Sequence, residues 1–583
     1  MYDIILIQKI LVFYGQEVGS MKKIIAISMA LCSVMAFASC GIRGGGPENS
    51  EKPVDLTKTQ LHVGTLDGGF GSKWLENYAN RFEELHAETV FETGKKGVQV
   101  HVEASRDYGL DSIQSVIKDV ETEVFFLEMS DYYQLISGGY LLEITDAVTT
   151  PLEEYNEQKS IVEKMYADDV AYFKTDDQKY YAIPVYEANY GIIYDVDMFE
   201  ENGFYFAAEG QGNEFGFVDA GDSDKANRSN GPDGEKGTDD DGLPATYEEF
   251  FKLCDYIASM EMYPITWAGA VPDYVNGLMM SMQADYEGVK QMKLNYTLNG
   301  KANLVSSIGQ DGKITTYEET ITPANGYLLQ KQAGRYYALK FVEQLVSKPG
   351  EYYDRNNCFS NAQSHMMAQT NFLQSRFDRD IKDVAMLIDG SWWFNEAKKT
   401  FDAMENIPGA SAGERKLGVL PLPKATTAEI GEATYFNNYM TELCIKSNIA
   451  PEKIDCAKQF IRYCRTNEAL SSFTADTSTT VPYEYTLEAK DEARISYYGA
   501  QLYKRHTESV KVSAWGRSKI YLADTRIHTI PTDAWNSVVG KGSFNIATEA
   551  FKNDGITAKQ YFEGLSTYMS QSAWESKYAS VLN

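Results

Sequence analysis

The segment Tyr180 to Asp195, with the sequence YYAIPVYEANYGIIYD, is the decisive one for the fold. It contains an Ile-Pro step at Ile183 and Pro184, with aromatic and polar side chains around it. It follows a part of the chain in which predicted strands alternate with predicted helices. The interpretation of this segment therefore depends on the preceding pattern and on the later blocks of sequence.

The first strand and helix are predicted directly after residue 60. Leu61 to Thr65 has the composition of a strand, and the glycine-rich turn 67–71 follows it. Ser72 is then placed to cap a helix. The apolar face of this helix would be formed by Trp74, Leu75, Tyr78, Phe82 and Leu85.

Two further strands follow before the decisive segment. Val98 to Val102 alternates apolar and polar residues, and Glu123 to Met129 is followed by Asp131, which is placed to cap a short helix. Strands separated by helices predict a mostly parallel α/β sheet. Ligands bind such sheets at the carboxyl ends of the strands, which are here Thr65 to Phe70 and Glu128 to Ser130.

The segment Tyr180 to Asp195 resembles the crossover of extracellular solute-binding proteins of the carbohydrate type (family 1). In that family the chain passes from the first lobe to the second at the Ile-Pro step. Three later blocks are similar to the family in order and character: 385–393, 416–424, and 456–473 followed by Val481-Pro482. The resemblance covers about residues 60 to 485.

The resemblance implies an α/β, two-lobed periplasmic-binding-protein-like fold with discontinuous lobes, a hinge and an interlobe cleft. We place the first lobe at 60–185 plus 434–478, and the second at 186–433 plus 479–583. The chain is longer than compact members of the family, and the excess falls near 205–245 and 285–375.

The resemblance also implies where a sugar would be bound. Sugars stack their C–H faces on aromatic rings and pair their hydroxyls with polar side chains, and the family presents an aromatic platform at the block 385–393. The predicted ligand contacts are Asp67, Phe70, Glu128, Tyr186, Glu187, Trp267, Asp389, Trp392 and Trp393.

Each of these residues has a structural alternative. Asp67 would only shape a turn, Glu128 would be a solvated charge at the edge of a strand, and Asp389 would cap the helix that follows it. One of the paired tryptophans, and Trp267, would then pack in the core.

The segment 219–242 is crowded with carboxylates and glycines. Asp233, Asp239 and Asp241 approach the spacing of an oxygen-rich Ca²⁺ loop, although the glutamate that ends an EF-hand loop is absent. Two interpretations stay open, a structural Ca²⁺ site and a solvated acidic loop. We expect no cofactor to be required, and a structural Ca²⁺ ion is the one candidate.

An export signal is predicted near the N-terminus. Lys22-Lys23 precedes the apolar run 24–38, which is too short to cross about 30 Å of hydrocarbon. We therefore assign 1–39 to a signal peptide rather than to a buried N-terminal helix. Because Met21 starts a complete signal peptide, 1–20 is interpreted as an over-long start.

The end of this segment, Phe37-Ala38-Ser39-Cys40, resembles a bacterial lipobox, with Phe37 in place of the usual leucine. The resemblance implies that Cys40 is lipidated. Residues 40–59 would then be the anchor and a flexible linker, since they include GGGPENS at 44–50.

Composition excludes several classes of function. A net charge of −29 repels phosphate backbones, so we expect no nucleic acid partner. The 6 histidines form no HExxH motif, and no nucleophile elbow is present, so we expect no enzyme. The five cysteines after Cys40 are an odd number, which predicts buried thiols rather than a full disulfide framework.

The sequence thus predicts a monomeric, lipid-anchored receptor at the extracellular face of the cell membrane. It would capture a mono- or oligosaccharide and deliver it to the permease subunits of an ABC transporter. Two alternatives stay open: a receptor for a non-sugar ligand on the same fold, and a surface glycoside hydrolase.

Overall fold

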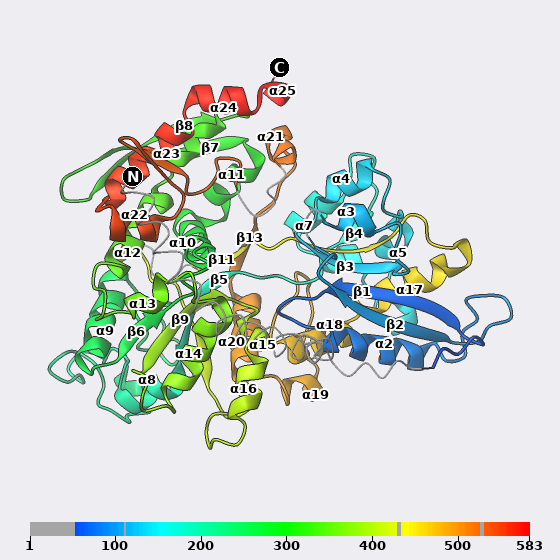
Figure 1. Cartoon of the computed structure of the whole chain (residues 1–583), viewed down its shortest axis with the longest axis horizontal. Coiled ribbons are helices and arrows are strands. Elements are labelled where there is room, and N and C mark those ends of the chain that lie inside the picture. The colour runs from blue at the N-terminus through cyan, green and yellow to red at the C-terminus, as the bar shows by residue number, and fades with distance from the viewer. Residues whose placement is uncertain (1–52, 110–111, 428–432, 525–529, 583) are drawn as a thin grey trace, which may run out of the picture. The chain divides into compact units, whose positions relative to one another are not determined.

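The computed structural model describes residues 53–109, 112–427, 433–524 and 530–582 (Figure 1). The predicted signal peptide, Cys40 and the glycine-rich linker lie outside these residues. All helices and strands below belong to the unit Thr57–Asn583. Among the described residues, none of the helices combines the length and the apolar composition that a membrane span requires.

The first lobe is built on a five-stranded sheet in the order β2-β1-β3-β12-β4. β1 (Thr59–Leu66) runs parallel to β2 (Val98–Ser105) and to β3 (Val124–Glu128). β12 (Thr441–Ile445) runs antiparallel to both β3 and β4 (Ala182–Ile183). A mostly parallel sheet was expected here and is confirmed, with β12 as the reversed strand.

Helices cover this sheet as the apolar pattern predicts. α2 (Lys73–Leu85) packs against β2 and buries Trp74, Leu75, Tyr78 and Phe82, whereas Leu85 is exposed. The predicted cap at Ser72 is wrong. Ser72 has helical backbone angles and makes no side-chain cap bond, and a capping side chain needs an extended residue. Asp131, which is extended, does cap α4 (Tyr132–Ser137) by accepting from the backbone N–H of Gln134.

The second lobe contains a four-stranded sheet in the order β10-β5-β9-β6. β5 (Tyr190–Asp195) is antiparallel to β10 (Leu417–Leu420) and to β9 (Val384–Gly390), and β9 is parallel to β6 (Tyr263–Thr266). Every residue of β9 is buried. The sheet is covered by, among others, α9 (Tyr247–Ser259), α10 (Asp273–Met292) and α14 (His365–Ser375).

The chain crosses between the two sheets more than once. β4 leads into β5 through residues 184–189, and β11 (Thr434–Asn437) leads into β12 through residues 438–440. β11 pairs in parallel with β13 (Val510–Ser513). Hydrogen bonds join these segments, since Ala188 donates its N–H to the Asn437 side chain and Glu187 donates its N–H to the carbonyl of Thr480.

The late helix expected at 456–473 is two helices, α17 (Ile454–Tyr463) and α18 (Asn467–Thr477). Thr466 separates them, because its hydroxyl accepts from the N–H of Ala469 and starts the second helix. All five described cysteines are free and buried, as expected.

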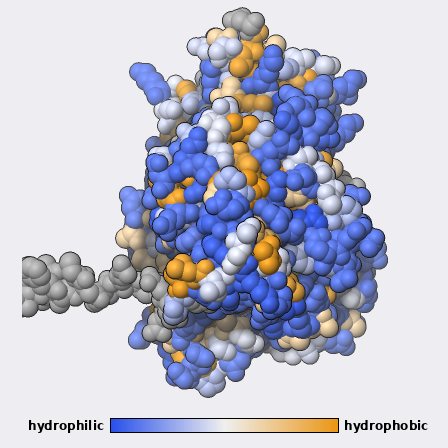
Figure 2. Space-filling model, turned by 90° about the vertical axis from the view of Figure 1, so that its right-hand side faces the viewer, coloured by the Kyte–Doolittle hydropathy of each residue, from blue (hydrophilic) through white to orange (hydrophobic). Residues whose placement is uncertain are grey.

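The insertion 285–375 and the C-terminal segment pack on each other. The insertion forms the antiparallel hairpin β7 (Gly300–Ile308) and β8 (Ile314–Ile321), followed by α12 (Ala333–Leu345). α12 contacts α10 on one side and, from the C-terminal segment, α22 (Ala547–Asn553) and α23 (Ala558–Tyr568). The face of the molecule in Figure 2 is mainly hydrophilic, with apolar residues in small patches. In the insertion, Leu304, Ile321 and Leu329 are buried in a core that also contains Trp574 and Tyr578 of the C-terminal segment.

Candidate functional site

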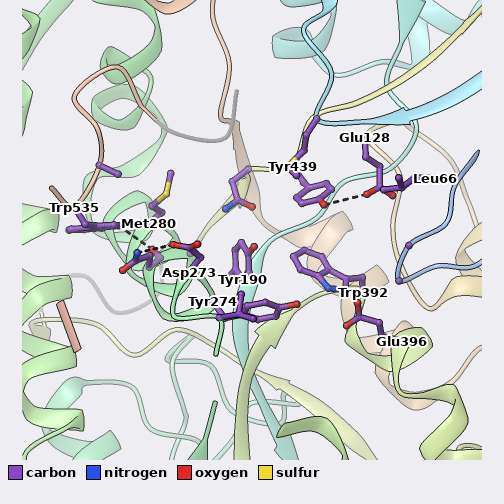
Figure 3. Close-up of a pocket in the computed structure, with 18 of the residues that line it drawn as sticks. Leu66, Glu128, Tyr190, Asp273, Tyr274, Met280, Trp392, Glu396, Tyr439 and Trp535 are labelled. Carbon is purple, nitrogen blue, oxygen red and sulfur yellow. Dashed lines mark hydrogen bonds between the residues drawn. The ribbon is translucent and has the colours of Figure 1, made fainter. Parts of the chain in front are cut away.

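A pocket of about 580 Å³ lies where residues of both sheets meet (Figure 3). This volume is in the range of small-molecule sites, about 300 to 1,000 Å³. Leu66 and Glu128 reach it from the carboxyl ends of β1 and β3, and Tyr190 from the start of β5. The carboxyl ends of the first-lobe strands are thus part of the site, as expected for an α/β sheet. The rest comes from the turns after β1 and β2, the residues after β9, helix α10 and the loop before it, the crossover segments and the C-terminal segment.

Aromatic side chains form one connected surface in this pocket. The Tyr190 ring lies 5.1 Å from Trp392 and 5.4 Å from Tyr274, and Trp392 lies 5.2 Å from Tyr439, measured between ring centroids. Tyr439 continues to Tyr186 at 6.2 Å. Such rings offer broad apolar faces to a ligand while their hydroxyl and N–H edges stay available for hydrogen bonds.

Glu128 is the carboxyl group that this aromatic surface surrounds on the first-lobe side. The hydroxyl of Tyr439 donates to it at 3.3 Å. Burial raises the pKa of Glu128 to about 7, because water is excluded and the charge of Glu396 opposes ionisation. The side chain can therefore accept or donate a hydrogen bond near neutral pH.

A second acidic group lies under Trp392. The side-chain amide of Gln369 donates to Glu396 at 2.8 Å and to Asp389 at 3.1 Å. Burial raises the pKa of both carboxyl groups. Glu396 lines the pocket and lies 3.6 Å from His365, whereas Asp389 is fully buried behind it. Asp389 therefore supports Glu396 through Gln369 and does not face the pocket.

Glu187 lies in the crossover. It accepts from Thr480 at 2.7 Å and contacts His506 at 2.5 Å, with Lys511 at 4.0 Å. Burial alone would raise the pKa of Glu187, but the charges of His506 and Lys511 outweigh it and lower the pKa. The carboxylate therefore ties together segments from distant parts of the chain.

The structure brings four of the nine predicted ligand contacts to the pocket: Phe70, Glu128, Tyr186 and Trp392. Asp67 is exposed instead and pairs with Arg106 at 3.5 Å. Glu187 and Asp389 lie behind the pocket wall, as described above.

The other two predicted contacts are core residues. Trp267 packs against Tyr353, with ring centroids 4.7 Å apart, and is 1% exposed. Trp393 is fully buried against Tyr498 at 5.6 Å. Trp392 and Trp393 follow β9 at the start of the short helix α15 (Trp393–Glu396), where consecutive side chains point in different directions, so one faces the pocket and the other the core.

Several lining residues were not predicted. Tyr190 begins β5 within the decisive segment, and Tyr439 lies in the short connection between β11 and β12, so their positions at strand ends were an available signal. Tyr274, on α10, and Trp535, in the C-terminal segment, stand where no strand end marks the site.

The acidic loop is held by contacts within the protein. Asp239 pairs with Lys225 at 2.9 Å and with Lys504 at 2.7 Å, and these two lysines lower its pKa. Asp241 is buried and accepts from the N–H of Gly237, while Asp233 accepts from the N–H of Glu235. Within the described parts of the chain, no three His, Cys, Asp or Glu side chains are grouped as metal ligands.

Comparison with known proteins gives a consistent picture of the fold. A family model described as "Bacterial extracellular solute-binding protein" matches residues 78–493. None of the curated proteins matches the chain. Among solved structures, a "Chitin oligosaccharide binding protein" matches with a TM-score of 0.53 at 14% identity, over 90% of this chain and 99% of that one. "SBP RafE in complex with raffinose" matches with a TM-score of 0.50 at 14% identity, over 88% of this chain and 100% of that one.

Proposed function

Because the chain belongs to the bacterial extracellular solute-binding proteins, we propose that it is the sugar-capturing lipoprotein of an ABC transporter. Its ligand would be a mono- or oligosaccharide. Two proteins of similar fold are described as binding raffinose and chitin oligosaccharide, which supports this ligand class.

The observation that carries the proposal is the aromatic surface around Trp392, with carboxyl groups at its edges. Tyr190, Tyr274 and Tyr439 surround this tryptophan, and Glu128 and Glu396 lie on either side of it in Figure 3. Rings that stack on sugar C–H faces and carboxyl oxygens that accept from hydroxyls are the two kinds of contact that a sugar needs.

Capture would proceed by closure of the two lobes. The hinge would be formed by residues 184–189, which connect the two sheets, and by residues 438–440, which connect β11 to the first-lobe sheet. A ligand that contacts both walls of the pocket stabilises the closed state, and the permease subunits would recognise that state. No covalent step is needed.

The site of action would be the extracellular face of the cell membrane. Lipid on Cys40 would hold the protein there, and the linker before Thr57 would give it reach. We expect a monomer, because a receptor that docks on two permease subunits needs no second copy of itself.

The test is a thermal-shift screen of the purified protein against mono- and oligosaccharides, followed by product analysis of each hit. A sugar that raises the melting temperature and stays intact supports the proposal. Cleavage of the hit would favour the glycoside hydrolase, for which Glu128 and Glu396 would be the two carboxyl groups. Stabilisation only by peptides or other non-sugar solutes would favour the alternative receptor.

Adjacent tryptophans provide a matched control. Trp392→Ala should weaken sugar binding about 30-fold, because a central tryptophan contributes about 2 kcal/mol. Trp393→Ala removes a ring of the same size from the core and should lower stability by about 3 to 5 kcal/mol. Its affinity for sugar at a temperature where it is folded should match that of the wild type. Equal affinity losses in both variants would contradict the assignment of the platform to Trp392.

A further inference from the structure

The C-terminal segment supplies one wall of the pocket. Residues 533–536 and Asn545 line it, although the family match ends at residue 493. In Figure 3, Trp535 and Met280 lie on the opposite side of the pocket from Glu128 and Leu66, with Tyr190 and Tyr274 between them. This wall therefore lies beyond the part of the chain that the family model covers.

Trp535 is separate from the aromatic surface around Trp392. Among the described residues, no ring contact joins the two. The indole N–H of Trp535 donates to the carbonyl of Asn276 at 3.2 Å, and the Asn276 side chain donates to Asp273 at 3.2 Å. Since its polar edge is satisfied within the wall, Trp535 offers only its apolar ring to the pocket.

Buried hydrogen bonds fix the turn that carries Trp535. The guanidinium of Arg335, on α12 of the insertion, is fully buried and lies 5.5 Å from the Trp535 ring. It donates to the carbonyl of Ala534 and to the hydroxyl of Thr532, the latter at 2.9 Å. The hydroxyl of Tyr561 donates to the carbonyl of Trp535 at 2.7 Å.

The backbone of this turn is strained. Asp533 and Ala534 have φ angles of 56° and 40°, in the left-handed region that side chains other than glycine disfavour. Two such residues in succession cost about 1 to 2 kcal/mol each, and they persist only where surrounding contacts determine the conformation. Core packing accounts for a tryptophan that is 3% exposed. It does not account for a strained turn that brings both Trp535 and Asn536 to the same pocket.

We propose that Trp535 is a second aromatic platform and that the pocket takes an oligosaccharide with one ring against Trp392 and another against Trp535. Asn536 and Asn545, in the same wall, would bind hydroxyls of the second ring. Arg335 is a positioning residue, since it acts through the turn and does not line the pocket. This inference rests on the proposed function, because it concerns the same site.

The test compares ligand lengths within each variant. Affinities for a homologous series of oligosaccharides of one to four rings, chosen from the screen, are measured by isothermal titration calorimetry. Trp535→Ala should lose about 30-fold in affinity for ligands of two or more rings and less than about threefold for the single ring, as expected for loss of one hot-spot tryptophan. Trp392→Ala should lose affinity for every length.

Two controls separate positioning from stability. Trp574 is also a buried C-terminal tryptophan whose indole donates to a backbone carbonyl, that of Pro323, but it does not line the pocket. Trp574→Ala should lower the melting temperature and leave the ratio of long-ligand to short-ligand affinity unchanged. Arg335→Met should lower that ratio, whereas Arg415→Met, at a buried arginine paired with Asp195, should not. If Trp535→Ala does not fold, Trp535→Leu replaces it, and if Trp574→Ala does not fold, Trp574→Leu replaces it. Both replacements keep an apolar side chain, and the same results are expected.

The outcomes distinguish this inference from the function on which it rests. If the wild type binds oligosaccharides and Trp535→Ala or Trp535→Leu binds all lengths equally well, the second platform is overturned and the receptor stands. If the wild type binds no sugar of any length, both are overturned. A wild type that binds only single rings also overturns the second platform.

Discussion

Replacing Glu128 with glutamine should stabilise the protein at neutral pH and leave its stability at acid pH unchanged. Glu128 stands at the end of β3 and lines the pocket, where the hydroxyl of Tyr439 donates to it. Burial raises its pKa from 4.5 to about 7. In the unfolded chain the same group ionises near its ordinary value.

The direction of the pH effect follows from proton linkage. Between pH 4.5 and 7 the folded protein keeps a proton on Glu128 that the unfolded chain has lost. Stability therefore falls as the pH rises through this window, and above pH 7 the full cost is present. A pKa rise from 4.5 to about 7 corresponds to about 3 kcal/mol, at about 1.4 kcal/mol per pH unit. Glutamine has the same shape and no charge, so Glu128→Gln should recover most of this free energy.

The assay is urea unfolding of the wild type and the variant at intervals from about pH 4 to pH 9, with the free energy of unfolding extrapolated to water. The difference between the two proteins should be near zero below pH 4.5 and grow to about 3 kcal/mol above pH 7. Glu84→Gln is the matched control, because Glu84 lies on α2 of the same lobe with a side chain 67% exposed. This control should show no such pH-dependent gain.

The same substitution should weaken ligand binding. A carboxylate accepts charge-assisted hydrogen bonds from sugar hydroxyls, and these are about twice as strong as those to an amide. The Glu128→Gln variant should therefore be more stable and bind sugar more weakly, as expected where a group that binds the ligand destabilises the fold. A stability difference that stays constant from pH 4 to pH 9 would refute the assignment of a buried, proton-binding carboxyl at this position.

Three further predictions concern the hinge, the acidic loop and the anchor. Glu187→Gln should cost about 3 to 5 kcal/mol of unfolding free energy, because it leaves the buried His506 ring and the partly buried Lys511 without their carboxylate partner. Asp146→Asn, at a pair whose carboxylate is exposed, should cost at most about 1 kcal/mol. Equal losses in urea unfolding would contradict this. A Ca²⁺ ion in the acidic loop predicts that EDTA lowers the melting temperature and Ca²⁺ restores it; an unchanged value in both would leave only the lysine pairs of Asp239. Cys40→Ser should move the protein from the membrane fraction to the culture supernatant on fractionation of cells, and retention in the membrane would contradict lipidation.

The parts of the fold that could be predicted are those that local pattern specifies. Period-2 alternation located β2 at its first residue, and the apolar runs located β1 and β3 within two residues at each end. Because the carboxyl ends of parallel strands meet at one edge of a sheet, Phe70 and Glu128 were expected near each other, and both line the pocket. The position of a residue at a predicted strand end thus helps to predict whether it lies near the site.

The sequence pattern does not determine the direction in which a side chain points. Trp392 and Trp393 are identical and adjacent, and only the course of the chain after β9 decides which one faces the pocket. Asp67 and Glu187 have the right chemistry for a sugar, but an exposed turn and a buried ion-pair network hold them elsewhere. Residue type near a strand end therefore predicts a neighbourhood rather than a contact.

Trp535 marks the limit of that reasoning. No periodic pattern points to this residue, because its place depends on Arg335, which is 200 residues earlier and belongs to the insertion 285–375. The insertion offers α12, the C-terminal segment packs α22 and α23 against it, and the strained turn between them is directed to the pocket. Contacts from both segments hold that turn, so neither segment alone would fix its conformation. This wall of the pocket therefore depends on the insertion and the C-terminal segment together, and a change in either should alter which ligand the pocket can hold.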